Sequence, residues 1–159
     1  MSNTQIPNLQ ALTVLEPYAT SIIYGNKRIE MRSYQLEIPN GEGIWLAIHA
    51  GGSTRLLDPE ICATIRFTRW SELPSEDHLR ENCGKILGLA KFIACLKAEE
   101  IPDDEVWKDH FDENKQLYCW LISEVKPLSI PINCRGNQRV WRLNQNLIQQ
   151  IMNDVGPFS

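Results

Sequence analysis

The sequence predicts a protein of the α+β class: a small mixed β-barrel with short helices inserted between its strands. Five or six short apolar stretches are typical of strands, and they do not alternate regularly with helices as in a doubly wound parallel sheet. The apolar stretch 85–96 is long and contains Gly88, which is typical of a bulge or bend in a barrel strand. A length of 159 residues fits one domain that buries its core without a metal or a disulfide.

The N-terminal residues predict a leader followed by a strand and a helix. Residues 1–9 are expected to form a disordered leader, so that residues 10–159 make up the single domain. Residues 11–15 predict a short strand. Pro17 then opens a short helix, because a proline at the first helical position loses no hydrogen bond, and Gly25 ends that helix.

The middle of the chain predicts two strands and two helices. Residues 27–34 alternate between apolar and charged side chains, as a half-buried strand does. Residues 43–50 are almost continuously apolar, which favours a central strand. Asp58 is placed to cap a helix that runs to about Trp70, and Ser75 is placed to cap a second, shorter helix.

The C-terminal part predicts the remaining elements. After the strand at 85–96 we expect a short helix at 103–111 and a strand at 116–123. Residues 125–132 contain two prolines and are expected to be irregular. Residues 134–143 predict the closing strand, and Asn144 is placed to cap a last helix.

The charge of the chain restricts the kinds of nucleic acid that it could bind. The formal net charge is −4 and the isoelectric point is near 5.4. Proteins that hold duplex nucleic acid by its phosphates carry a basic excess instead. Any contact with nucleic acid is therefore expected in a local pocket that contains a few Lys and Arg residues.

The sequence carries no pattern for a metal, a cofactor or a membrane. The 5 cysteines form no Cys-x-x-Cys pair, and neither they nor the 3 histidines have the spacing of zinc ligands. The cysteines fit small buried side chains in a reducing compartment. There is no secretory signal pattern and no apolar run of about 20 residues. We expect a cytoplasmic protein with no metal, no cofactor and no membrane contact.

Residues 12–34 resemble the opening of ASCH (activating signal cointegrator homology) domains. The resemblance is carried by the motif Gly25-x-Lys27-x-x-Glu30-x-Arg32. Later stretches agree in order, at residues 44–50, 85–90 and 131–143. The resemblance covers about residues 11–143 and implies a barrel of the PUA-like superfamily with a role in RNA metabolism or in RNA-linked transcriptional regulation.

The chain departs from the ASCH pattern at two positions next to the helix start. Glu16 stands where the family usually has Gln, and Tyr18 stands where it usually has Trp. Tyrosine keeps an aromatic face. The carboxylate of Glu16 is expected to make the cleft more acidic and to oppose tight phosphate binding.

We expect the ligand cleft between the helix that Pro17 opens and the barrel. Tyr18 could stack on a base, and Arg32 could bind a phosphate or base edge through two N–H groups, with Lys27 as a second charge. The candidate nucleic-acid-binding residues are Tyr18, Lys27, Arg32, Ser33, His49, Arg135, Gly136 and Asn137. Structural alternatives stay open: an ion pair of Glu30 with Arg32, a hydrogen-bonded histidine at a strand end, and a plain turn at 135–137.

Three classes of function remain. The first is an RNA- or nucleotide-binding module that takes a single-stranded or modified base. The second is a small amidohydrolase of the type that ASCH-like enzymes represent, acting on acylated cytidine, with Lys27 and Glu30 as its catalytic residues. Glu30 stands where those enzymes carry Thr, and strand alternation would put the two side chains on opposite faces. A nuclease in the same cleft, which would use Lys27, Arg32 and His49, belongs to this class. The third is an interaction module of the transcriptional coregulator type, with a protein partner.

Overall fold

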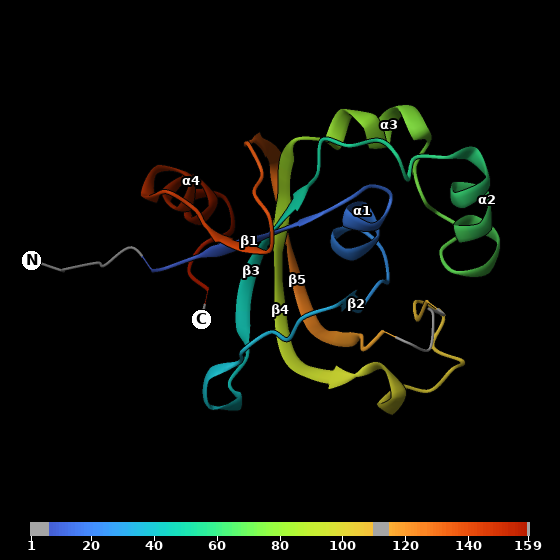
Figure 1. The fold of residues 1–159 in the computed structure, drawn as a ribbon. Helices are drawn as coiled ribbons and strands as arrows, with labels where there is room; N and C mark the ends of the chain where they lie inside the picture. Colours follow the sequence, from blue (N-terminus) through green and yellow to red (C-terminus); the bar gives the residue numbers. More distant parts are fainter. Residues whose placement is uncertain (1–6, 110–114, 159) are drawn as a thin grey trace, which may run out of the picture.

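Six strands form one curled mixed sheet in the order β2-β5-β4-β3-β1-β6 (Figure 1). The computed structural model describes residues 7–109 and 115–158. The strands are β1 (Gln10–Val14), β2 (Ile29–Arg32), β3 (Ile44–Ala50), β4 (Lys85–Lys97), β5 (Tyr118–Asn133) and β6 (Val140–Arg142). The sheet curls into a half-barrel with short helices between its strands, which confirms the predicted fold class.

The parallel pairing of β1 with β3 shapes the edge where the candidate site lies. Both strands run in the same direction, with Val14 opposite Ala50, and the other strand pairs are antiparallel. The segments that follow β1 and β3 therefore leave the sheet side by side. β3 is buried from Trp45 to Ala50 and lies between β1 and β4, which confirms that it is central.

The four helices are α1 (Tyr18–Ile23), α2 (Pro59–Thr68), α3 (Glu76–Asn82) and α4 (Gln145–Val155), with short 3₁₀ turns η1 (Pro39–Gly41) and η2 (Ala98–Glu100). Three of the four helices begin where capping residues predicted them, and α1 begins at Tyr18, one residue after Pro17, without a side-chain cap. The side chains of Asp58, Ser75 and Asn144 accept hydrogen bonds from backbone N–H groups in the first turns of α2, α3 and α4.

Both faces of the sheet are covered, because side chains alternate along its strands. Leu46 and Ile48 pack with Ile22 of α1 on one face. Trp45 and Ala47 pack on the other face, in the cluster that holds the buried side of α4. The pair α2 and α3 forms a third cluster with the start of β2. Figure 1 shows α1 and α4 on opposite sides of the sheet.

The segment 125–132, predicted to be irregular, is part of β5, so that prediction is wrong. β2 pairs with β5 only over residues 118–121, so within the described chain the later part of β5 pairs with β4 alone. The register of β5 on β4 also shifts between Ile86 and Gly88, opposite Pro127. A strand tolerates proline at such an unpaired edge or bulge, because the missing N–H would have had no partner there.

The predicted helix at 103–111 is also wrong over the part that the structure describes; residues 110 and 111 lie outside it. Residues 103–109 form turns. Side-chain hydrogen bonds hold them: Trp107 Nε1 donates to Asn26 Oδ1 at 2.9 Å, and Lys108 Nζ donates to the Ile101 carbonyl at 2.8 Å. The first contact anchors the segment to the turn before β2, and the second ties the segment to its own start; periodicity alone does not reveal them.

The ends of two predicted elements shift. Of the expected leader, residues 1–6 lie outside the described chain, while Leu9 is buried and its carbonyl accepts a hydrogen bond from Leu143 N at 3.2 Å. β2 begins at Ile29, two residues later than predicted. Lys27 therefore lies in the turn before the strand, which changes the geometry of the candidate site.

Candidate functional site

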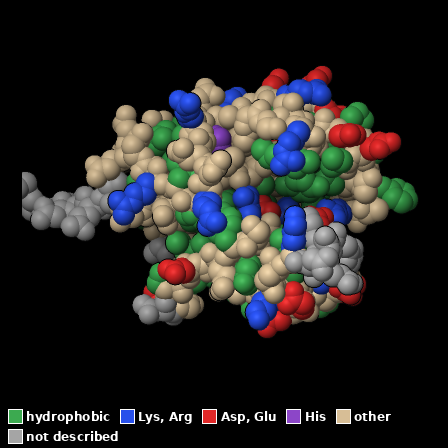
Figure 2. Space-filling model, in the orientation of Figure 1, with side chains coloured by type: hydrophobic (Ala, Val, Ile, Leu, Met, Phe, Trp, Pro, Cys, Tyr) green, Lys and Arg blue, Asp and Glu red, His purple; other side chains and the backbone are tan. Residues whose placement is uncertain are grey.

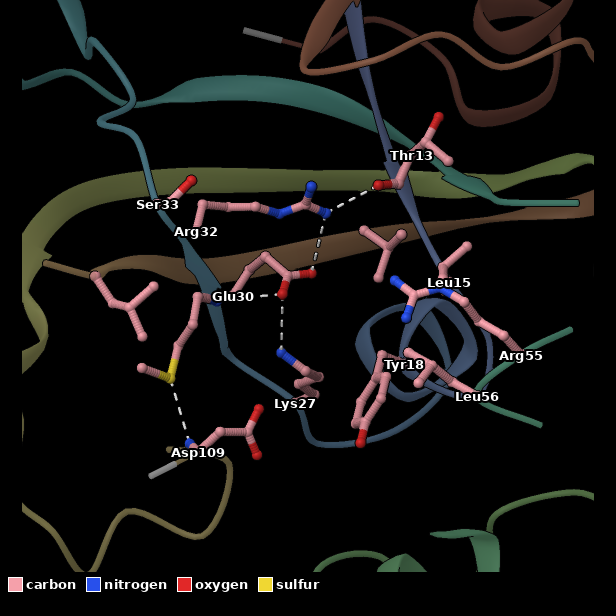
Figure 3. Close-up of a pocket in the computed structure, with 13 residues that line it drawn as sticks. Thr13, Leu15, Tyr18, Lys27, Glu30, Arg32, Ser33, Arg55, Leu56 and Asp109 are labelled. Carbon is pink, nitrogen blue, oxygen red and sulfur yellow. Dashed lines mark hydrogen bonds and ion pairs between the residues drawn. The ribbon is translucent and has the colours of Figure 1, made fainter. Parts of the chain in front are cut away.

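Two connected hollows open beside α1 and the ends of β1 and β3. The first, here called the Lys27 cavity, has a volume of about 420 Å³ (Figure 3). It is lined by Thr13, Val14, Leu15, Tyr18, Lys27, Glu30, Met31, Arg32, Ser33, Arg55, Leu56, Asp109 and Leu117. The second, here called the Arg139 groove, is wider, at about 1090 Å³. It is lined by Thr13, Leu15, Arg32, His49, Gly51, Gly52, Ser53, Arg55, Gly136, Asn137, Gln138 and Arg139.

Lys27 is held in place by the tight turn between α1 and β2. Its backbone N–H donates to the Ser21 carbonyl at 3.1 Å. Gly25 allows this turn, because a Cβ there would lie 2.8 Å from both the Ser21 oxygen and the Trp70 ring. The Lys27 side chain is only 5% exposed, and Nζ donates to the Ile29 carbonyl.

The ammonium group of Lys27 reaches Glu30, which corrects the prediction that the two side chains lie on opposite faces. Nζ is 3.6 Å from Glu30 Oε1. Strand alternation does not apply, because β2 begins only at Ile29. Nζ also lies 5.9 Å from the centre of the Tyr18 ring and 5.8 Å from that of Trp107. Aromatic faces of this kind stabilise a partly desolvated cation.

Glu30 lies between two cations, and one of its oxygens lacks a hydrogen bond. Figure 3 shows Lys27 and Arg32 approaching its carboxylate from opposite sides. Oε2 is 3.7 Å from Arg32 Nη2, which is too long for a hydrogen bond, and no described residue donates one to it. A buried carboxylate oxygen without a donor is costly. The cavity therefore contains an acceptor that a ligand N–H could satisfy.

Arg32 stands where the Lys27 cavity and the Arg139 groove meet, since it lines both. Its Nη2 donates to the Thr13 carbonyl at 2.9 Å, and its side chain is 24% exposed. The guanidinium group is thus fixed from one side. Its remaining N–H groups have no hydrogen-bond partner among the described residues.

Tyr18 forms part of the cavity wall and also packs against the third core cluster. Its ring meets that of Trp107 edge to face at 6.4 Å. Burial, and secondarily the charge of Asp109, raise the pKa of its hydroxyl above the ordinary value, so the phenol is neutral at pH 7. Asp109 also lines the cavity, and its carboxylate accepts a hydrogen bond from Arg69 at 2.9 Å. Ser33 lines the same cavity from an exposed position.

His49 is buried at the end of β3, and both of its ring nitrogens have partners. Nε2 lies 2.7 Å from the Cys134 carbonyl and therefore donates to it; Nδ1, at 3.1 Å, accepts from the Thr13 hydroxyl. Burial lowers the pKa of the ring below its usual value. Trp141 Nε1 donates to the same Thr13 oxygen at 3.3 Å. This network ties β1, β3 and the segment before β6 together.

The three residues of the turn at 135–137 differ in whether they line the groove. Gly136 and Asn137 line the Arg139 groove, whereas Arg135 lines neither hollow. Gly136 is needed for contact with His49, because a Cβ there would lie 2.6 Å from the ring atom Cε1. The sequence did not predict a glycine that packs on a side chain at this position.

Sequence reasoning missed two arginines of this site. Arg55 lines both hollows, and Arg139 lines the groove. Arg55 follows β3, and its place in the site depends on the parallel pairing of β1 with β3. This pairing brings the segments after the two strands to the same edge of the sheet. Figure 2 shows Lys and Arg side chains gathered across the middle of this face, with most acidic side chains toward its margins.

Glu16 does not line either hollow, so the predicted acidic effect on the cleft is wrong. Its side chain is fully buried, and its oxygens accept hydrogen bonds from the N–H and the hydroxyl of Thr20. Asn82 Nδ2 donates to the same hydroxyl at 3.2 Å, which links α1 to α3. Burial raises the pKa of Glu16 to about 7.

The described residues contain no group of three or more His, Cys, Asp or Glu side chains placed to hold a metal ion. Within the same residues, no helix combines the length and the apolar character needed to cross a membrane. The 5 cysteines are unpaired, and burial raises the pKa of Cys62 to about 11.

Comparison with known sequences finds relatives that contain a similar segment. No protein-family model matches the chain. The chain is 24% identical over 138 residues to human activating signal cointegrator 1, and 22% identical over 138 residues to the mouse protein. In both cases the match covers 87% of this chain but only 23% of the relative. The chain thus spans about a quarter of the length of these relatives.

Comparison with solved structures finds the same fold in the crystal structure of ASCH from Zymomonas mobilis. The TM-score is 0.54 at 14% identity, over 91% of this chain and 94% of that one. Two point mutants of the Zymomonas protein match with TM-scores of 0.53 and 0.54. Sequence similarity to a segment of activating signal cointegrator 1 and the fold shared with the Zymomonas protein together support the resemblance of this chain to ASCH domains.

Proposed function

We propose that this chain is an ASCH domain that binds single-stranded RNA and takes one nucleobase into the Lys27 cavity. The observation that carries the proposal is the buried charge cluster at the cavity floor, where Lys27 and Arg32 flank Glu30. A volume of about 420 Å³ lies within the usual range for a small-ligand site. Sequence-specific readers of RNA use such pockets for splayed-out bases.

The chemistry of the cavity suits a base edge that carries a donor beside an acceptor. Glu30 Oε2 lacks a hydrogen bond and would accept from a ring or exocyclic N–H. Arg32 lies 3.7 Å away and would donate to a neighbouring carbonyl or ring nitrogen. The ring of Tyr18 on the wall supplies an aromatic surface for the base.

The proposal is tested by the affinity of a short, mixed-sequence, single-stranded RNA, measured by fluorescence anisotropy. Arg32→Ala should weaken binding by about 1–3 kcal/mol, the scale of a charge-assisted hydrogen bond to a desolvated partner. Arg80→Ala is the matched control, because Arg80 is exposed on α3 and pairs only with Asp77 among the described residues. Thermal unfolding of both variants checks that the fold is intact.

Equal affinity of the wild type and Arg32→Ala would remove the cavity from consideration. If RNA does not bind, and the purified protein shows no absorbance of nucleic acid at 260 nm, the protein-interaction function becomes the better proposal.

One observation favours a second candidate function, the amidohydrolase. Lys27 and Glu30 lie together in the cavity, so a carboxylate that could act as a base stands 3.6 Å from a cation that could stabilise an oxyanion. A nuclease that uses His49 is less well supported, because both ring nitrogens of His49 already have partners.

A further inference from the structure

Arg139 has an unusual backbone conformation. It is the one non-glycine residue of the described chain with a positive φ, at 59°. Such a conformation is uncommon outside glycine, asparagine and aspartate, and it persists only where surrounding contacts enforce it. The guanidinium carbon lies 4.4 Å above the centre of the Tyr34 ring, a cation–π contact that favours this position of the charge. Arg139 is therefore a preorganised cation on the wall of the groove.

The charge of the Arg139 groove contrasts with that of the whole chain. The net charge is −4, yet the described lining of the groove contains three arginines and no acidic residue. These arginines are Arg32, Arg55 and Arg139. A surface with this composition attracts an extended anion.

The floor of the groove is formed by small residues at the ends of β3 and before β6. Around Gly52 there is open space, since no atom lies within 4 Å of where its Cβ would be. Gly51 and Gly136 pack directly against Leu15 and His49, and no side chain rises from either of them into the groove. Backbone N–H groups at such sites can be approached closely by phosphate oxygens.

The groove is continuous with the Lys27 cavity, because both are lined by Thr13, Leu15, Arg32 and Arg55. We infer that the Arg139 groove binds the phosphodiester backbone of the nucleotides adjoining the base in the Lys27 cavity. The ligand is then an oligonucleotide and not a free nucleotide. This inference rests on the proposed function.

The test compares two ligands: a mixed-sequence RNA hexanucleotide, and the four nucleoside 5′-monophosphates as competitors. Arg139→Asn removes the charge with a residue that tolerates positive φ. Arg80→Asn is the matched control, because Arg80 is exposed on α3 and lines neither the groove nor the cavity. Thermal unfolding confirms that both variants are folded.

We expect Arg139→Asn to weaken the hexanucleotide about tenfold. The slope of log affinity against log salt concentration should become shallower by about 0.7, the loss of one phosphate contact on a single strand. Binding of the monophosphates should not change, and Arg80→Asn should stay within about twofold of the wild type for both ligands.

The outcomes separate the inference from the proposed function. If the hexanucleotide binds no more tightly than the monophosphates, or if Arg139→Asn and Arg80→Asn have equal effects, the groove is not a backbone site. The proposed function would survive that result provided that Arg32→Ala still weakens both ligands. If neither ligand binds, both proposals are wrong.

Discussion

Glu16 is fully buried at the start of α1, so the free energy of unfolding should depend on its ionisation. Burial raises its pKa to about 7 against hydrogen bonds from Thr20 and Asn82 that lower it. In the unfolded chain the pKa returns to its ordinary value near 4.5. At a pH between these two pKa values, Glu16 is protonated in the folded state and ionised in the unfolded state. The contribution of Glu16 to stability is therefore greatest below pH 4.5 and falls as the pH rises to about 7, by about 3 kcal/mol at most.

Glu16→Gln should abolish this fall, because an amide keeps the shape and does not ionise. Urea unfolding of the wild type and the variant at several pH values between 5 and 8 measures the difference. His49 acts in the opposite sense, since its pKa is lowered by burial and stability is lost as the pH falls below about 6.5. Both proteins carry His49, so its effect cancels in the difference. Parallel pH profiles would show that Glu16 does not titrate in this range.

For the other residues of the site, the residue type indicated a place in the cleft but did not indicate the contacts that the side chain makes. Lys27 and Arg32 were identified as cations of a cleft, and both line the Lys27 cavity. The sequence could not reveal that Lys27 turns toward Glu30, because that depends on where β2 begins. Arg139 was missed because its position depends on a positive φ and on the ring of Tyr34, which is far away in the sequence.

At the scale of elements, the residue at which a capped helix begins was more predictable than the extent of a strand. The caps at Asp58, Ser75 and Asn144 are local hydrogen bonds between residues a few positions apart, so the sequence contains all their information. The extent of β5 depends instead on which strand lies beside it. Its two prolines suggested a loop, but the edge of β5 that faces away from β4 is unpaired after residue 121 and accepts them.

Gly88 was predicted to mark a bulge, and the register of β4 shifts there on both β3 and β5. A Cβ at this position would lie 2.6 Å from the Lys126 carbonyl oxygen and 3.1 Å from Ile23. Gly88→Ala should therefore destabilise the protein by about 1–3 kcal/mol, the cost of overpacking between a strand and α1. Gly52→Ala is the control, because its Cβ would meet no atom within 4 Å. A Gly88→Ala variant as stable as Gly52→Ala in urea would mean that β4 and β5 can separate locally.

At the scale of the whole molecule, the parallel pairing of β1 and β3 creates the candidate site. The chain leaves both strands at the same edge of the sheet, and α1 and the segment 51–56 follow from there. The composition predicted a local basic site on an acidic protein, and the described lining of the Arg139 groove agrees with that picture. The order of the six strands could not be predicted from the sequence, because it is set by contacts between distant segments.

At the scale of the whole molecule, an assay with N4-acetylcytidine distinguishes a binding module from an enzyme. Removal of the acetyl group needs a nucleophile, a proton acceptor and an oxyanion partner within hydrogen-bond reach of one carbonyl. Lys27 and Glu30 could supply the last two. The hydroxyl that the ASCH-like amidohydrolases carry at position 30 is absent, and the Thr13 hydroxyl is already bonded to His49. We therefore expect no detectable conversion of N4-acetylcytidine to cytidine.

Chromatography of the nucleosides after prolonged incubation with the wild-type protein measures this conversion. Glu30→Gln keeps the size of the side chain but removes the only carboxylate bonded to Lys27 among the described residues, so it serves as the matched variant. Turnover by the wild type that disappears in Glu30→Gln and in Lys27→Ala, with both variants still folded by circular dichroism, would establish an enzyme. RNA binding would then be the way in which the protein holds its substrate, because the reacting base and the neighbouring phosphates would occupy the same cavity and groove.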